Sequence, residues 1–189
     1  MTSKNSDSDP FDLDFTSLFN PATTVEEPHP TAVEEKALAE EAVIGESKLT
    51  SNGYFVRINE AAPKRKARGN PPTVLVVEDD EVTATLLGRI LQANGFAVSY
   101  AATRAAIIDG IKVFPDIVIM DVMMPDANGF DILSRIRTHP TLQETPVLML
   151  TSLGSLDDIL KGLKLGANGY LTKPAKSRAL LDAIKQVLA

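Results

Sequence analysis

The chain has 189 residues, with 19 basic and 25 acidic side chains, a formal net charge of −6, two histidines and no cysteine. Without cysteine it forms neither a disulfide nor a thiolate metal site, and two histidines far apart argue against a histidine metal centre. The backbone of a nucleic acid requires a basic surface, so a net acidic chain predicts no nucleic-acid partner.

The first 62 residues form an acidic extension, with 4 basic and 12 acidic side chains. They are rich in Ser, Thr, Pro and Glu and poor in apolar clusters, which predicts an extension that is largely disordered. Its first residues lack the basic and apolar regions of a secretory signal, and no apolar run in the chain approaches the length of a membrane span. We therefore expect a cytoplasmic protein.

Three short runs depart from this composition. Residues 9–19 alternate acidic residues with Phe and Leu. This pattern is typical either of a solvated, disordered tail or of a short motif that becomes ordered when it docks on a partner, and both interpretations stay open. Residues 31–46 favour a helix, but its large apolar side chains are few, so the helix is marginal alone. Residues 53–58 resemble a short strand that could pair with a sheet edge.

Residues 63–72 contain four basic side chains, three prolines and one glycine. Proline and glycine interrupt regular structure and like charges repel, so a solvated linker is the favoured interpretation. Contact with nucleic acid or anionic lipid is the alternative. It is disfavoured because the basic residues have no aromatic or amphipathic neighbours.

From residue 73 to residue 189 the pattern becomes a regular alternation of strands and helices. The expected strands are residues 73–77, 96–100, 116–120, 146–150 and 169–172. The expected helices are residues 81–95, 103–114, 129–139, 155–166 and 176–189. Five such units predict an α/β domain, doubly wound, with a five-stranded parallel sheet and helices on both faces.

Chemically useful side chains stand at the carboxyl ends of four of these strands. Glu78 and Asp79 follow the first, Asp121 the third, Thr151 the fourth and Lys173 the fifth. Open α/β sheets bind ligands outside this edge. Three carboxylates together favour Mg²⁺, which takes oxygen ligands, and Asp121 could then attack a phosphoryl group as a nucleophile. Thr151 could donate a hydrogen bond to one phosphoryl oxygen, and Lys173 could pair with another.

With these motifs in family order and spacing, residues 73–189 resemble the receiver domain of two-component response regulators, of the CheY-like superfamily. The motifs are VLVVEDD (74–80), VIMDVMMPDANG (118–129), VLMLTS (147–152) and GANGYLTKP (166–174). The resemblance implies a flavodoxin-like fold with strand order 2-1-3-4-5. It also implies that Asp121 accepts a phosphoryl group from a histidine kinase or a histidine phosphotransfer protein.

The resemblance assigns further roles around Asp121. Asp79 would bind the magnesium ion directly, Glu78 through water, and Met123 through its backbone carbonyl. Tyr170 matches the switch aromatic of the family, which turns inward when Thr151 moves towards the phosphoryl group. This movement would reshape the face of the fourth helix, fifth strand and fifth helix, where a downstream protein would bind.

Other polar residues in these motifs have structural explanations. Asp80 and Glu81 suit the start of a helix, where acidic groups complement the dipole, and Asn128 suits the cap of the next helix. Met123 and Leu153 flank the route of an attacking water in this family. Neither can orient water by hydrogen bonding, so we expect slow self-dephosphorylation.

These observations predict a stand-alone receiver that signals through phosphorylation-dependent protein contacts and has no DNA-binding output domain. It would not be an enzyme beyond magnesium-dependent self-phosphorylation and self-dephosphorylation. One alternative is a phosphorylation-independent adaptor, which would have no need for the complete set of Asp121, Thr151 and Lys173. Another is an aspartyl-phosphate phosphohydrolase, which would place a second Asp where Met123 stands.

Overall fold

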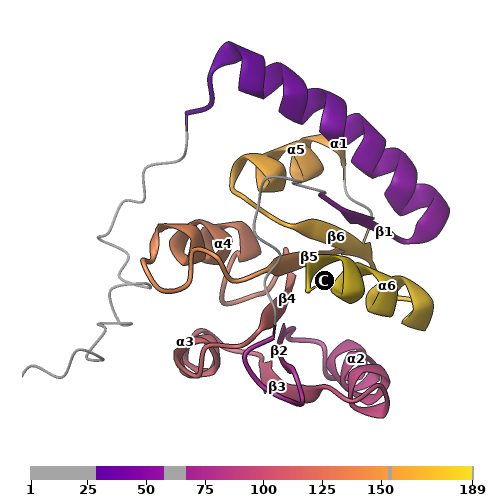
Figure 1. Cartoon of the computed structure of the whole chain (residues 1–189), viewed down its shortest axis with the longest axis vertical. Helices are drawn as coiled ribbons and strands as arrows, with labels where there is room; N and C mark the ends of the chain where they lie inside the picture. Colours follow the sequence, from indigo (N-terminus) through magenta and orange to yellow (C-terminus); the bar gives the residue numbers. More distant parts are fainter. Residues whose placement is uncertain (1–28, 58–66, 153–154, 189) are drawn as a thin grey trace, which may run out of the picture.

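A computed structural model describes residues 29–57, 67–152 and 155–188. One six-stranded sheet, in the order β1-β6-β5-β4-β2-β3, lies between layers of helices (Figure 1). The strands are β1 Tyr54–Val56, β2 Thr73–Val77, β3 Ala97–Ala101, β4 Ile117–Asp121, β5 Val147–Thr151 and β6 Gly169–Thr172. The helices are α1 Ala32–Asn52, α2 Glu81–Ala93, α3 Arg104–Lys112, α4 Gly129–Thr138, α5 Leu156–Lys164 and α6 Ser177–Val187.

The five strands β2 to β6 are parallel, in the spatial order β3-β2-β4-β5-β6. Numbered from β2, this is the predicted order 2-1-3-4-5, so the predicted α/β fold is confirmed. Side chains of α2 and α6 pack on one face of the sheet, and those of α3, α4 and α5 pack on the other. Both faces of the central strands are covered, which explains why every residue of β4 and β5 is buried.

Polar side chains define where the helices start. Asp80 accepts a hydrogen bond from the backbone N–H of Thr83 at the start of α2. Asn128 accepts one from Phe130 at the start of α4, and Ser155 accepts one from Asp158 at the start of α5. Each cap satisfies a backbone donor that the first turn leaves free. The helix-start roles expected for Asp80 and Asn128 are therefore confirmed.

The N-terminal extension differs from the sequence prediction. A 21-residue helix, α1, and a strand, β1, occupy the part expected to be largely disordered, and β1 makes the sheet six-stranded by pairing antiparallel with β6. Thr31 and Glu34 form a capping box at the start of α1, and Gly53, with φ +80°, ends it. The strand expected near residues 53–58 is confirmed as an edge strand. The run at residues 9–19 lies outside the described residues.

Helix α1 is stable here because it packs on the domain. Its buried residues are Leu38, Ala42, Gly45 and Leu49, and they belong to the side of the core that also contains α5. Figure 1 shows α1 beside β1 and α5, at the β6 end of the sheet. A helix with a thin apolar face gains its stability from such packing rather than from its own propensity.

Buried Asp116 attaches the end of the linker to the domain. One carboxylate oxygen accepts a hydrogen bond from the backbone N–H of Arg68 at 2.6 Å, and the other accepts one from Thr73 N–H at 2.8 Å. Residues 67–72 of the predicted linker are thereby tied to the start of β2, while residues 63–66 lie outside the described range.

Among the described residues, none of the helices is both long and apolar enough to cross a membrane.

The cap of α4 gives a test of local stability. We expect Asn128→Ala to lower the free energy of unfolding by about 1 kcal/mol, because the N–H of Phe130 loses its side-chain acceptor. Asn128→Asp, which keeps an oxygen acceptor, should retain most of the stability. Urea denaturation of both variants and the wild type measures the difference, and equal losses in the two variants would contradict the capping role.

Candidate functional site

Four neighbouring strands bring the predicted site residues to one edge of the sheet. Asp121 and Thr151 are the last residues of β4 and β5, Glu78 follows β2 directly, and Lys173 follows β6 directly. In the sheet, β4 lies between β2 and β5, and β6 is next to β5. All four residues therefore stand at the carboxyl edge, where open α/β sheets bind their ligands.

The Lys173 ammonium group is the centre of the site. Its Nζ lies 2.7 Å from Asp121 Oδ2, to which it donates a hydrogen bond, and 2.6 Å from Glu78 Oε2. The Glu78 side chain is 1% exposed and that of Asp121 10%, while that of Lys173 is 19% exposed. One cation thus neutralises two largely buried carboxylates, which would otherwise repel each other.

Burial changes the proton affinities of this group. It raises the pKa of the Glu78 carboxyl, and the contact with Lys173 offsets this only in part. Burial also acts to lower the pKa of Lys173, but its close contacts with the Asp121 and Glu78 carboxylates outweigh burial and raise that pKa. Because the folded pKa of Glu78 is raised, its contribution to stability is present at low pH and is lost as the pH rises through that pKa. A further cation beside Glu78 would favour its charged form and so act against the effect of burial.

The acidic cluster fits a divalent cation. Glu78, Asp79 and Asp121 each offer a carboxylate oxygen, and these oxygens lie within 4.8 Å of one another. Glu78 Oε2 is a buried oxygen without a hydrogen-bond donor among the described residues, and only its ion pair with Lys173 offsets the burial. Oxygen ligands, with one exposed carboxylate to keep contact with water, match the preferences of Mg²⁺.

Backbone contacts orient both carboxylates. Asp121 Oδ1 accepts a hydrogen bond from the N–H of Met123 at 3.2 Å, and Glu78 Oε1 accepts one from the N–H of Asp80 at 3.2 Å. The Met123 side chain points to solvent and is 73% exposed. The expected use of its carbonyl as a metal ligand stays a prediction, as does the phosphoryl contact of Thr151. Leu153 lies outside the described residues.

Gly129 has a role at the site that the sequence did not reveal. A Cβ atom at this position would overlap the backbone carbonyl of Asp121 and come within 3.0 Å of Val122 Cα. Its N–H also donates a hydrogen bond to Val122 O at 2.9 Å. The small size of Gly129 is what lets α4 start against the end of β4.

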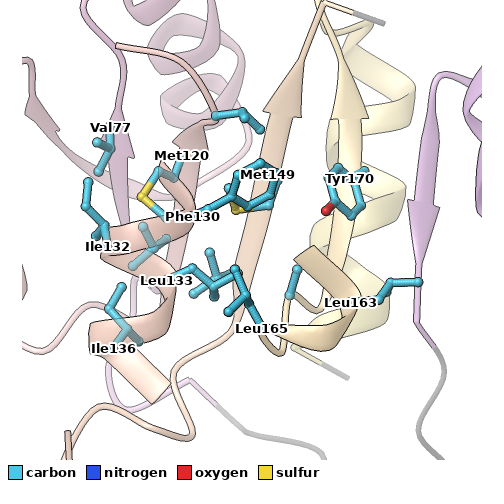
Figure 2. Close-up of a cluster of buried hydrophobic side chains, with 14 of the residues drawn as sticks. Val77, Met120, Phe130, Ile132, Leu133, Ile136, Met149, Leu163, Leu165 and Tyr170 are labelled. Atoms are coloured by element: carbon cyan, nitrogen blue, oxygen red, sulfur yellow. The ribbon is translucent and has the colours of Figure 1, made fainter. Parts of the chain in front are cut away.

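The predicted switch residue, Tyr170, is fully buried. Its hydroxyl donates to the backbone carbonyls of Asp158 and Ile159 at 2.9 and 3.3 Å, and burial raises its pKa far above the usual value. Figure 2 shows the ring beside Met149, its register partner on β5. The Tyr170 side chain thus points inward and packs among the buried core residues.

A groove of about 520 Å³ lies beside Lys173. Leu49, Thr50 and Gly53 of the extension line one part of it, and Ser155 and Thr172 line another. The extension therefore reaches the neighbourhood of the site, which the sequence did not predict. Only the strand-like run at residues 53–58 gave any signal for it.

Comparison with known families gives one match. The model of the response regulator receiver domain matches residues 74–185. These residues contain the acidic cluster and all four strand ends described above.

Individual relatives match the same region. CpxR of Escherichia coli, a transcriptional regulatory protein, is 40% identical over 116 residues, which are 61% of this chain and 48% of that protein. RpaA of Synechocystis, a DNA-binding dual master transcriptional regulator, is 33% identical over 124 residues, 62% of this chain and 49% of that protein. The solved structure of the chemotaxis response regulator CheY4 of Vibrio cholerae is 34% identical with a TM-score of 0.58, covering 62% of this chain and 98% of that chain.

These relatives correct two expectations from the sequence. We expected no nucleic-acid partner and no DNA-binding output domain, but the matched relatives are transcriptional regulators, and one is named as DNA-binding. The chain spans about half the length of these curated relatives. The acidic charge describes only the present residues, so it does not exclude action on DNA through another part of such a protein.

The acidic cluster predicts a magnesium-dependent gain in stability. If Mg²⁺ binds only the folded protein, it should raise the free energy of unfolding by about 2.7 kcal/mol at one hundred times its dissociation constant. Asp79→Asn should weaken this effect because it replaces a negatively charged carboxylate of the cluster with a neutral amide. Asp126→Asn, in the exposed loop after β4, is the matched control. Thermal unfolding across a magnesium titration measures all three proteins, and equal responses would contradict the assignment.

Proposed function

This chain belongs to the response regulator receiver domain family, and from this premise we propose that Asp121 is its phosphoacceptor. The donor is a phosphorylated histidine of a kinase or of a histidine phosphotransfer protein. Residues 73–189 form the receiver in this proposal, and Mg²⁺ is its cofactor. The chain acts as a signalling component and not as an enzyme with a separate substrate.

The observation that carries the proposal is the contact of one ammonium group with two carboxylates. Lys173 Nζ lies within 2.7 Å of both Asp121 Oδ2 and Glu78 Oε2, at the carboxyl edge of the sheet. The contact places a cation beside the carboxylate that would act as the nucleophile. A structural ion pair would need only one carboxylate, whereas a phosphoryl site needs an acceptor carboxylate, a metal-binding acid and a cation in one place.

The proposed transfer breaks the bond between phosphorus and the donor's imidazole nitrogen and forms a bond between phosphorus and an oxygen of Asp121. Lys173 can then exchange its contact with Asp121 Oδ2 for one with a phosphoryl oxygen while it keeps its ion pair with Glu78. Thr151, at the end of the next strand, can donate its hydroxyl hydrogen to another phosphoryl oxygen. Bound Mg²⁺ would be held by Glu78, Asp79 and Asp121 and would supply positive charge at the reacting group.

We propose that the signal controls transcription, because the matched relatives are named as transcriptional regulators. The receiver contributes phosphorylation and a change of packing around Tyr170. In this proposal a separate output domain would bind the DNA, as the name of RpaA, a DNA-binding regulator, suggests for that protein.

Intact-mass spectrometry tests the acceptor directly. After incubation with Mg²⁺ and a small phosphodonor, we expect the wild-type protein to gain the mass of one phosphoryl group. Asp121→Asn should gain none because the nucleophilic carboxylate is gone, and Asp126→Asn should behave as wild type. Chelation of the metal should prevent the gain. A phosphoryl group retained in Asp121→Asn would contradict the proposal.

Slow loss of the phosphoryl group is a second prediction. Met123 is exposed beside Asp121 and cannot orient an attacking water. We expect Met123→Asn to shorten the half-life by up to about tenfold, the equivalent of one neutral hydrogen bond. Met123→Leu is the apolar control. Loss of the added mass over time gives the half-lives, and a wild-type half-life of seconds would contradict the prediction.

A further inference from the structure

The N-terminal extension covers the end of the sheet. Strand β1 pairs antiparallel with β6, and α1 packs along α5, so residues 32–56 lie over the β6 edge (Figure 1). Strand β1 also contributes Val56 to the side of the core that contains α6. The three elements α5, β6 and α6 are the face on which the resemblance places a downstream partner. In this chain, the chain's own segment occupies that face.

Two glycines allow the close packing of β1, one on β6 and one on α1. A Cβ atom at Gly169 of β6 would overlap the carbonyl of Phe55 and come within 3.0 Å of Val56 Cα. A Cβ atom at Gly45 of α1 would lie 2.9 Å from the Phe55 ring. Gly169 therefore lets β1 approach the backbone of β6 closely, and Gly45 lets the Phe55 ring of the extension lie against the backbone of α1.

Charges outside the apolar contact fix the position of α1. Lys164 of α5 pairs with Glu35 at 3.0 Å, and Arg57, just after β1, pairs with Glu41 at 3.0 Å. Both pairs are partly exposed, so each contributes little to stability. They instead fix the position of α1 along its neighbours, because its two acidic side chains pair with a basic residue on α5 and with one just after β1.

The extension also contacts the switch residue. Phe55 and Tyr170 are register partners on β1 and β6, so their side chains lie on the same face of the sheet. Phe55 is 3% exposed and fills the place beside Tyr170 on the side away from Met149. On the inner side, Gly162 of α5 makes room for the Tyr170 hydroxyl, because a Cβ atom there would overlap it. The ring is thus enclosed from both directions.

A backbone contact joins the extension to the site. The N–H and the hydroxyl of Thr172 donate to the carbonyl of Gly53 at 3.0 and 3.2 Å. The next residue is Lys173, whose own N–H donates to the carbonyl of Thr151 at 2.7 Å. Two successive amides of one strand end therefore bind two different elements, one to the extension and the other to β5.

We propose that residues 32–56 are an intramolecular cap, which occupies the interaction surface of β6, α5 and α6 and holds Tyr170 inward. The surface accepts a helix with a small-residue face and an antiparallel strand that follows it, and the chain's own α1 and β1 supply both. A downstream protein gains this surface only when the cap leaves. The cap needs no phosphoryl group, so this proposal stands apart from the proposed acceptor role of Asp121.

Paired variants in the full chain test the cap. Leu38→Asp with Ala42→Asp places two charges on the buried face of α1, and Val43→Asp with Ile44→Asp places two charges on its exposed face. Amide exchange followed by NMR then compares Thr172, which is bonded to the cap, with Lys173, which is bonded to β5. We expect the Thr172 amide to exchange at least about tenfold faster in the first variant only, with Lys173 unchanged.

A second variant and a second signal complete the test. Gly169→Ala acts from the β6 side, and it should also speed exchange at Thr172 because its methyl group meets the β1 backbone. The ring signals of Tyr170 should shift in both uncapped proteins and stay unchanged in the exposed-face control, while those of Tyr100, on β3 at the opposite edge of the sheet, serve as the reference. Unchanged Thr172 exchange in both uncapping variants would overturn the cap. Faster exchange with an unmoved Tyr170 signal would overturn its hold on the switch.

Discussion

The ion contacts of Lys173 are the constraint on which the site depends. Glu78 and Asp121 are both buried near the same sheet edge, and the Lys173 ammonium group offsets the repulsion between their carboxylates when both are charged. Lys173 reaches them from β6, across the intervening strand β5. The end of β6 is therefore coupled electrostatically to the ends of β2 and β4, and a new charge at Asp121 changes the balance of forces on β6.

Strand β6 connects the site to the N-terminal extension and to the core. Within a few residues it carries Lys173 at the site, Thr172 bonded to Gly53 of the extension, and Tyr170 in the core. Tyr170 belongs to a row of register partners across the sheet, with Met120 and Met149 on one side and Phe55 on the other. A displacement of β6 at the site and a displacement of the extension would therefore both change the packing of the side chains in this row.

The sequence predicted those parts of the fold that depend on local pattern. Buried runs and strand ends placed Asp121, Thr151 and Lys173 at one edge, and the cap residue Asn128 was recognisable from its position. The docked extension was not predictable in the same way. Its buried helical face uses Ala42 and Gly45, whose small size permits close approach but gives no strong apolar pattern. Its stability arises from a surface formed by residues more than a hundred positions later, which no local pattern encodes.

The pairing of β1 with β6 also governs how the protein behaves towards other copies of itself. A sheet edge with free N–H and C=O groups is a template for further strands, and proteins commonly protect such edges. Here β1 supplies the protection on the β6 side, so departure of the extension would uncover a short, apolar, aggregation-prone edge. If β1 left without a replacement strand, the N–H and C=O groups of β6 would be open to pairing with a second copy of this chain.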